Sequence, residues 1–339
     1  MDHRESYAKN WDQAAAAEML RQAESDRAAM AARPGIGRRL FGLPELDAPL
    51  YQAAGLWLSA HGEMAPTTTP QPASAPDVFL ATKLYPDGGH TALIGDLTAA
   101  LSSIHPGAPP PFLLLSQIQD SEKPPPPEVI ERTGIRPQNI RIIAAPCPAQ
   151  RMAGLLRTLR ALRPRRLFLL HHPEDSAAAA CARNEVVPEC YLLHHADAAP
   201  SLGVFLPDIR LIDLHPHAAA LSRNQGLRPA LLPLTCPDPG PPGIPPSAPF
   251  ATAVCGSHHK FDDALFLSYA DTVPLILENI DSEHIHIGHL PKAKLATIRD
   301  RIAARGQDPD RENHSRQHRR QPPHDSLPCS NPSRECARD

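Results

Sequence analysis

Histidines gather in four groups along this chain of 339 residues. The groups are His171-His172, His194-His195 with Asp197 close behind, His215 with His217, and His258-His259. Imidazole titrates near neutral pH, so it can act as a general base or donate a hydrogen bond to a hydroxyl or phosphate group. Paired histidines at a strand end can instead cap backbone carbonyls or pack in the interior. Both roles stay open for every group.

A metal-binding role is suggested by a different spacing. His215 and His217 are two residues apart, as are His284 and His286, so each pair would share one face of an extended strand. Such pairs occur in zinc hydrolases. No carboxylate completes either pair, and the isoleucines that alternate with the second pair are typical of an ordinary buried strand. A metal-dependent hydrolase therefore stands as an alternative function, and we predict no bound metal or cofactor.

A glycine turn interrupts an apolar run that begins at Asp77. The run stops at Pro-Asp-Gly-Gly-His-Thr and resumes with helical spacing as far as Leu101, which predicts a strand, a turn and a helix. Gly88 and Gly89 allow backbone N–H groups to approach a ligand, and the start of a helix favours negative charge. Sugars, phosphates and carboxylates are the usual ligands of such turns. The alternative is a tight turn that the glycines merely permit.

Short apolar runs alternate with helical runs beyond this turn. Strands are predicted at 78–84, 111–118, 141–146, 166–172, 189–195 and 209–216, with helices after Thr91, over 152–162 and from 218 to 222. Runs of such continuous apolar character suit parallel strands that are covered on both faces. The predicted fold class is α/β, a doubly wound parallel sheet. Ligands of such sheets bind beyond the carboxyl ends of the strands, here the loops that start at Pro86, His171, His194 and His215.

The chain divides into six predicted segments. They are a helical N-terminal extension (1–65), a linker (66–76), an α/β domain (77–235), a linker rich in proline and glycine (236–249), an incomplete second α/β domain (250–306) and a disordered tail (307–339). Within the extension, one helix is expected inside 1–33 and another over 47–61, capped by Asp47 with Pro49 in its first turn. The second domain should contain a strand at 251–256, helices over 269–279 and 291–305, and a strand at 284–288.

The tail lacks the residues that build a core. After Gly306 it has one leucine, no valine or isoleucine, and no hydrophobic periodicity. Two explanations remain open: a truncation or shifted reading frame that replaced the rest of a sheet domain, and a native basic tail.

Bulk composition excludes several classes of protein. Apolar residues make up 42% of the chain, enough for substantial cores, and the formal net charge of −3 comes without a basic stripe that would bind nucleic acid. No uninterrupted apolar segment approaches the roughly 20 residues that cross a bilayer. Seven cysteines without a C-x-x-C pair fit reduced packing thiols. We expect a cytoplasmic protein with no nucleic-acid partner and no transmembrane segment; its oligomeric state is left open.

Three blocks together resemble bacterial glycosyltransferases of the two-domain GT-B type. They are LYPDGGHTALIGDL, then YLLHHADAAPSLGV with LPDIRLIDLHPH, then CGSHHKFDDAL with YADTVPLILENI and HIHIG, and the resemblance spans about residues 77–305. It implies an N-terminal acceptor domain, a C-terminal domain for the nucleotide sugar, and catalysis in the cleft between them. The Gly-Gly-His turn resembles a loop that faces the sugar and the donor diphosphate, which assigns this role to Gly88, Gly89 and His90.

The resemblance also suggests roles for the other two blocks. In the second block, His194, His195 and Asp197 would contact the acceptor or act as the base. The third block resembles the second domain of O-linked N-acetylglucosaminyltransferase-like proteins, in which a lysine contacts the donor diphosphate. Lys260 stands at the matching place, and His258 and His259 precede it.

The predicted function is transfer of a sugar from a nucleotide-sugar donor to an unknown acceptor. The part of the family's donor domain that holds the base, ribose and sugar has no counterpart in the tail. A non-catalytic binding remnant is therefore a second alternative, beside the metal-dependent hydrolase. The donor sugar and nucleotide, the acceptor and the stereochemical outcome are left open.

Overall fold

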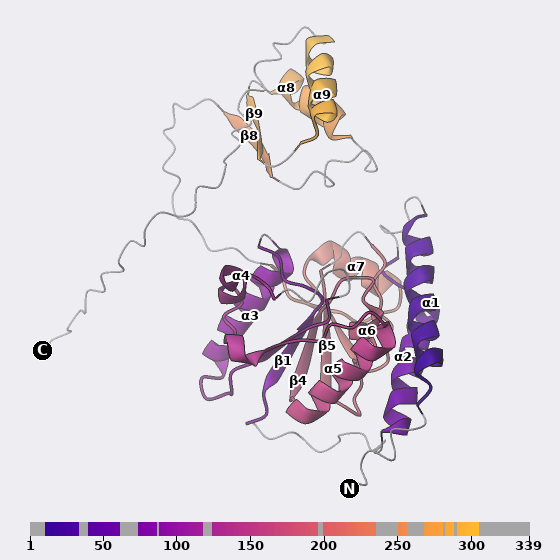
Figure 1. Ribbon diagram of the computed structural model, residues 1–339. Helices are drawn as coiled ribbons and strands as arrows, with labels where there is room; N and C mark the ends of the chain where they lie inside the picture. The colour runs from indigo at the N-terminus through magenta and orange to yellow at the C-terminus, as the bar shows by residue number, and fades with distance from the viewer. Residues whose placement is uncertain are drawn as a thin grey trace, which may run out of the picture. The chain divides into compact units, whose positions relative to one another are not determined.

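The computed structural model describes residues 11–33, 40–61, 74–86, 88–117, 124–195, 199–234, 250–255, 268–280, 282–287 and 290–304. The chain divides into two compact units, Met1–Cys236 and Pro237–Asp339. Figure 1 labels the helices and strands of both units. Among the described residues, none of the helices combines the length and apolar character needed to cross a membrane.

A seven-stranded sheet forms the centre of the first unit, and every strand pairs in parallel with its neighbours. Its strands are β1 (Asp77–Ala81), β2 (Phe112–Leu115), β3 (Ile140–Ile142), β4 (Arg166–Leu170), β5 (Glu189–His194), β6 (Ile209–Asp213) and β7 (Ala230–Leu231). The spatial order is β3-β2-β1-β4-β5-β6-β7, so the chain order reverses between β1 and β4. This is the arrangement of a doubly wound sheet, which confirms the predicted α/β fold class.

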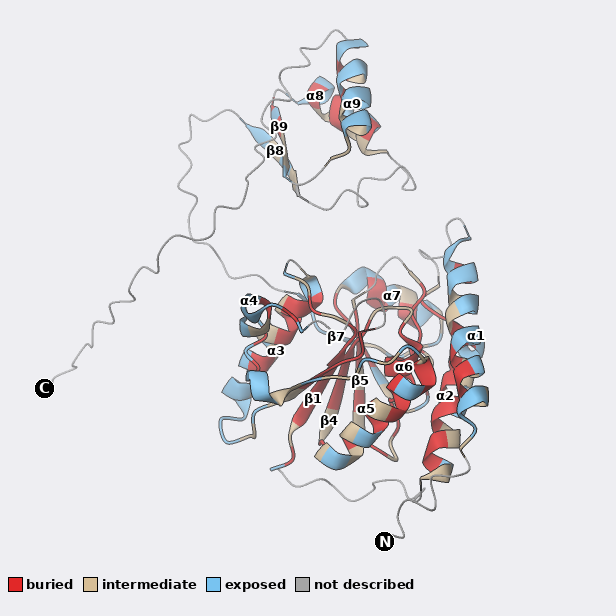
Figure 2. Cartoon of the chain, viewed as in Figure 1, coloured by how far each residue is buried: buried red, intermediate tan, exposed pale blue. Residues whose placement is uncertain are grey.

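Helices cover both faces of this sheet (Figure 1). They are α1 (Gln13–Ala31), α2 (Pro44–Ala60), α3 (Gly89–Ile104), α4 (Pro127–Glu131), the 3-10 turn η3 (Pro137–Asn139), α5 (Pro148–Leu162), α6 (Ser176–Ala179) and α7 (Pro216–Asn224). Residues of α1, α2, α5 and α6 build one hydrophobic core, and residues of α3 and α4 build another. Figure 2 shows the central strands buried, as their continuous apolar sequences predict.

The start of α2 differs from the prediction. The helix begins at Pro44, and Asp47 lies inside its first turn instead of capping it. The buried Asp47 carboxylate accepts the backbone N–H groups of Gly203 and Phe205, both at 2.7 Å. The predicted cap is therefore wrong, because this carboxylate binds backbone from a distant segment instead of the N–H groups of its own helix.

The second unit contains a two-stranded parallel sheet and two helices. Its elements are β8 (Ala251–Cys255), α8 (Tyr269–Asn279), β9 (Glu283–Ile287) and α9 (Lys292–Ala304). The two helices pack through Val273, Leu277, Ile298 and Ile302. The helix over 269–279 and the two strands appear where the sequence predicts them.

The side chains of β9 are oriented opposite to the prediction, which placed its isoleucines in the interior. His284 is buried, whereas Ile287 is 50% exposed. The hydroxyl of Tyr269, the first residue of α8, lies 2.9 Å from His284 Nε2 and 2.9 Å from His286 Nδ1. The imidazole face of β9 therefore binds α8, and the prediction of an ordinary strand buried through isoleucine is wrong.

Candidate functional site

Adjacent histidines point to opposite faces of the main sheet. On β4 and β5, Leu169 and Leu192 belong to the core under α1, α2, α5 and α6, while Leu170 and Leu193 belong to the core under α3 and α4. Side chains alternate along a strand, so His171 and His194 continue the first set and His172 and His195 the second. Each predicted histidine pair is thus divided between two environments.

One member of each pair joins His90 and Tyr85 in what we call the carboxyl-edge cluster: Tyr85, His90, His172 and His195. The His90 ring lies 5.8 Å from that of His172 and 5.6 Å from that of His195, centroid to centroid. Tyr85 stacks on His172 at 5.7 Å and meets His90 edge-on at 5.4 Å. The residues come from the ends of β1, β4 and β5 and from the first turn of α3, beside the point where the strand order reverses. Doubly wound sheets bind ligands at this point.

The turn before α3 holds this cluster in place. The N–H of Gly88 donates to the Tyr85 carbonyl at 3.2 Å, and the N–H of Tyr85 donates to Thr91 Oγ1 at 3.0 Å. A Cβ on Gly88 would lie 3.0 Å from the Cβ of Tyr85, whereas one on Gly89 would have no atom within 4 Å. Close packing therefore requires the first glycine, and the second leaves the helix start open.

Hydrogen bonds to carbonyl groups orient two of the imidazoles. His90 Nε2 lies 2.6 Å from the Lys83 carbonyl, and His195 Nδ1 lies 3.3 Å from that of Leu193. Because a carbonyl only accepts, these nitrogens carry the protons. In the neutral rings the lone pair is then on Nδ1 of His90 and on Nε2 of His195.

Burial keeps both rings neutral. It lowers the pKa of His195 to about 4, and the neighbouring His90 ring adds to this effect. Burial likewise lowers the pKa of His90, with a further contribution from His172. At neutral pH both side chains can therefore accept a proton or a hydrogen bond, as a general base must.

Two charged groups flank the cluster. The Lys83 ammonium lies 5.3 Å from the centre of the Tyr85 ring, and the Glu174 carboxylate lies 3.8 Å from His172 Nδ1. The start of α3, from which His90 comes, also favours negative charge. The cluster thus combines neutral bases with positive potential.

Sequence reasoning missed the side chains that fasten the strand ends. The buried Asp175 accepts the hydroxyls of Thr82, at 2.6 Å, and of Ser116, and the N–H of Ala178 at 3.0 Å. Thr82 Oγ1 in turn accepts the N–H of His172 at 2.8 Å. This network joins the ends of β1, β2 and β4. Its only sequence signal is the Asp-Ser start of α6, which predicts a helix cap.

His194 and His171 lie in the interior and outside the cluster. His194 Nδ1 donates to Asp213 at 3.0 Å, with both residues buried and paired in register on β5 and β6, and the Phe41 ring packs against the imidazole at 4.3 Å. His171 Nδ1 donates to the His172 carbonyl at 2.7 Å. These two histidines hold strand ends and loops together on the opposite face of the sheet from the cluster.

Four predicted site residues, Asp197, His258, His259 and Lys260, lie outside the described residues, so their roles stay predictions.

The strand geometry that the alternative metal-binding role requires of His215 and His217 is not observed. His215 is the N-cap of α7, where its Nδ1 accepts the Ala218 N–H at 3.1 Å, and His217 lies in the helix itself. The two imidazoles therefore do not share a strand face. Within the described ranges, no three His, Cys, Asp or Glu side chains are placed to hold a metal ion.

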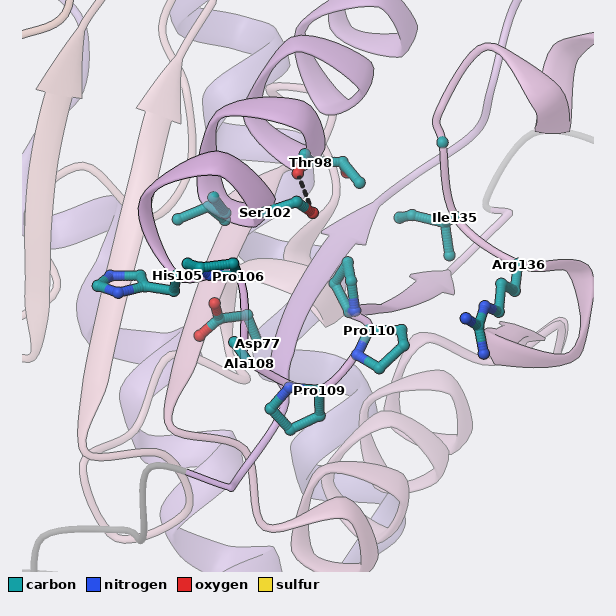
Figure 3. A pocket seen from close by; sticks show the side chains of 13 residues that line it. Asp77, Thr98, Ser102, His105, Pro106, Ala108, Pro109, Pro110, Ile135 and Arg136 are labelled. Atoms are coloured by element: carbon teal, nitrogen blue, oxygen red, sulfur yellow. Dashed lines mark hydrogen bonds between the residues drawn. The ribbon is translucent and has the colours of Figure 1, made fainter. Parts of the chain in front are cut away.

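Two hollows lie elsewhere on the first unit. One, of about 230 Å³, is at the amino-terminal edge of the sheet, between the end of α3, the proline-rich segment 106–111 and segment 134–136 (Figure 3). The other, of about 450 Å³, lies beside β5, β6 and β7. Neither is lined by His90, His172 or His195.

Comparison with known proteins gives little further information. No protein-family model matches the sequence, and no curated protein matches it. A solved structure of a mutant O-GlcNAc transferase from Thermobaculum terrenum is similar at a TM-score of 0.45 and 12% sequence identity. The match covers 88% of this chain and 57% of that one, so this chain spans less than two thirds of that protein. A likeness at this level says nothing about the chemistry of this chain.

Proposed function

We propose that the carboxyl-edge cluster is the acceptor side of a glycosyltransferase site, and that a nucleotide sugar is the donor. One observation carries the proposal: at the strand-order reversal, His195 Nδ1 donates to the Leu193 carbonyl, which leaves Nε2 of the neutral ring as the nitrogen that can accept a proton. The three sequence blocks that resemble GT-B glycosyltransferases support the same reaction.

The proposed reaction needs one base and one site for developing negative charge. An acceptor hydroxyl attacks the anomeric carbon of the donor, and a new C–O bond forms as the bond to the nucleoside diphosphate breaks. His195 Nε2 takes the hydroxyl proton, while the leaving diphosphate carries away the electron pair. The α3 start and the Lys83 ammonium are the groups that would stabilise that negative charge.

A substrate screen tests the proposal. The chain is incubated with UDP- and GDP-sugars and a panel of hydroxyl acceptors, and released nucleotide and glycosylated product are measured. His195→Gln should reduce turnover roughly 10²- to 10⁴-fold, the usual contribution of a general base, while donor binding is kept. His105→Gln is the matched control, because His105 lines the hollow at the opposite edge of the sheet.

Three outcomes are informative. Product formation that requires His195 and not His105 supports the proposal. Donor binding without turnover in any panel indicates a binding module instead. Turnover that survives His195→Gln unchanged refutes the assignment of the base.

A further inference from the structure

We propose that the carboxyl-edge cluster takes up a proton when a phosphate-type dianion binds to it. The inference deepens the proposed function and rests on it, because a nucleoside diphosphate is the donor's leaving group. This uptake would make ligand binding at the same site depend on pH, with a phosphate-type dianion as the ligand group.

Geometry provides the first argument. Three imidazoles from three different elements form one group, in which the rings of His172 and His195 lie within 5.8 Å of the His90 ring, centroid to centroid. Two of them donate one N–H to a backbone carbonyl, so the second ring nitrogen of each is the atom that can gain a proton. Repulsion from the neighbouring rings disfavours the protonated forms of His90 and His195, and a bound anion would offset it.

The charges around the cluster provide the second argument. The Lys83 ammonium lies over the Tyr85 ring, and the Glu174 carboxylate lies near His172. Asp175 is connected to the His172 backbone through Thr82, and the buried His171 acts on His195 from the opposite face of the sheet. Asp175 already accepts two hydroxyls and one backbone N–H, and Glu174 faces His172. No carboxylate of the described residues is among the groups that affect the titration of His90 or His195. The carboxylates of the described residues therefore do not balance a charge on His90 or His195, and a bound anion would do so.

A bound dianion reverses both causes of neutrality. It replaces lost solvation and offsets the repulsion among the rings, so a proton from solvent binds to Nε2 of His195 or Nδ1 of His90, and the new N–H donates to an anion oxygen. Because proton and anion binding are linked, anion affinity should rise as pH falls, by up to about tenfold per pH unit. In the proposed transfer, the terminal phosphate becomes a dianion only when its bond to the sugar breaks. Nε2 of His195 is therefore free to take the acceptor proton before that step, and it keeps the proton while the released diphosphate is bound.

Proton NMR of the histidine rings tests the inference in the full chain. Sulfate is the probe because it remains a dianion across the titration, and chloride at equal ionic strength is the reference. The pKa of His195 should rise from about 4 by at least about one pH unit in sulfate. His105, which is exposed at the other edge of the sheet, should not respond beyond general salt effects. In His90→Gln the rise at His195 should shrink, while an unchanged chemical shift of His61, which stacks on Trp57 in the same unit, shows that the fold is retained.

Each outcome decides a separate question. A pKa rise at His195 no larger than that at His105 overturns the inference, even if sugar transfer is observed. A clear rise without transfer from any donor leaves an anion site and refutes the proposed function. UDP and inorganic phosphate are then compared at pH 7: a response to UDP at much lower concentration indicates a nucleoside diphosphate, and equal responses indicate free phosphate.

Discussion

His195 should make the free energy of unfolding depend on pH in a way that one substitution removes. Its pKa falls from the ordinary value of 6.5 to about 4 on folding because the ring is buried. Between these values the unfolded chain binds more protons than the native state, so stability rises with pH through this window. At about 1.4 kcal/mol for each pH unit, the difference corresponds to about 3 kcal/mol. In His195→Gln this contribution is absent. The free energy of unfolding of the variant should therefore increase relative to that of the wild type as pH falls from 6.5 to 4.

Asp47 provides an internal control of opposite sign. Burial raises its pKa from 3.8 to about 6, although two backbone N–H groups oppose that change. The native state now binds more protons than the unfolded chain, so stability falls as pH rises from about 4 to about 6, by about 3 kcal/mol on the same scale. The free energy of unfolding of Asp47→Asn should therefore increase relative to that of the wild type as pH rises from about 4 to about 6.

Urea unfolding, followed by tryptophan fluorescence at several pH values, measures both effects. The two tryptophans of the chain, Trp11 and Trp57, lie in the first unit, and Trp57 is buried beside α1, so the signal reports the unit that contains both sites. The differences between variant and wild type should have opposite slopes with pH. Two flat difference curves, or two of the same sign, would refute the reasoning.

Two further predictions test packing and the second unit. A Cβ on Gly95 would lie 2.3 Å from the backbone carbonyl of Arg132, so Gly95→Ala should lower the free energy of unfolding by about 1–3 kcal/mol in urea titrations. Gly89→Ala should have little effect, since its Cβ would meet nothing within 4 Å; equal losses in the two variants would contradict this account. Tyr269→Phe removes the hydroxyl between the two imidazoles of β9 and should cost the second unit about 1–3 kcal/mol, measured by amide hydrogen exchange. Unchanged protection of the β9 amides would show that this hydroxyl does not hold α8 to the sheet.

Local sequence features predict the elements of this protein well. Continuous apolar runs such as 166–170 predict buried parallel strands, because side chains on both faces must be covered. Helical spacing predicts the helix over 269–279, and the Gly-Gly-His turn predicts the start of a helix after β1. These features depend on periodicity and turn chemistry, which neighbouring residues determine among themselves.

The content of the candidate site depends on segments that are distant in sequence. The sequence by itself determined that histidines follow strands at the carboxyl edge of an α/β sheet. Only the tertiary structure decided that His172 and His195 meet His90 while His171 and His194 face the opposite core, because the residue at which each strand ends sets which side chain points to which face. Tertiary contacts also decided that the Asp47 carboxylate accepts backbone N–H groups of a distant segment, since a buried carboxylate is satisfied by whichever N–H groups the fold brings to it.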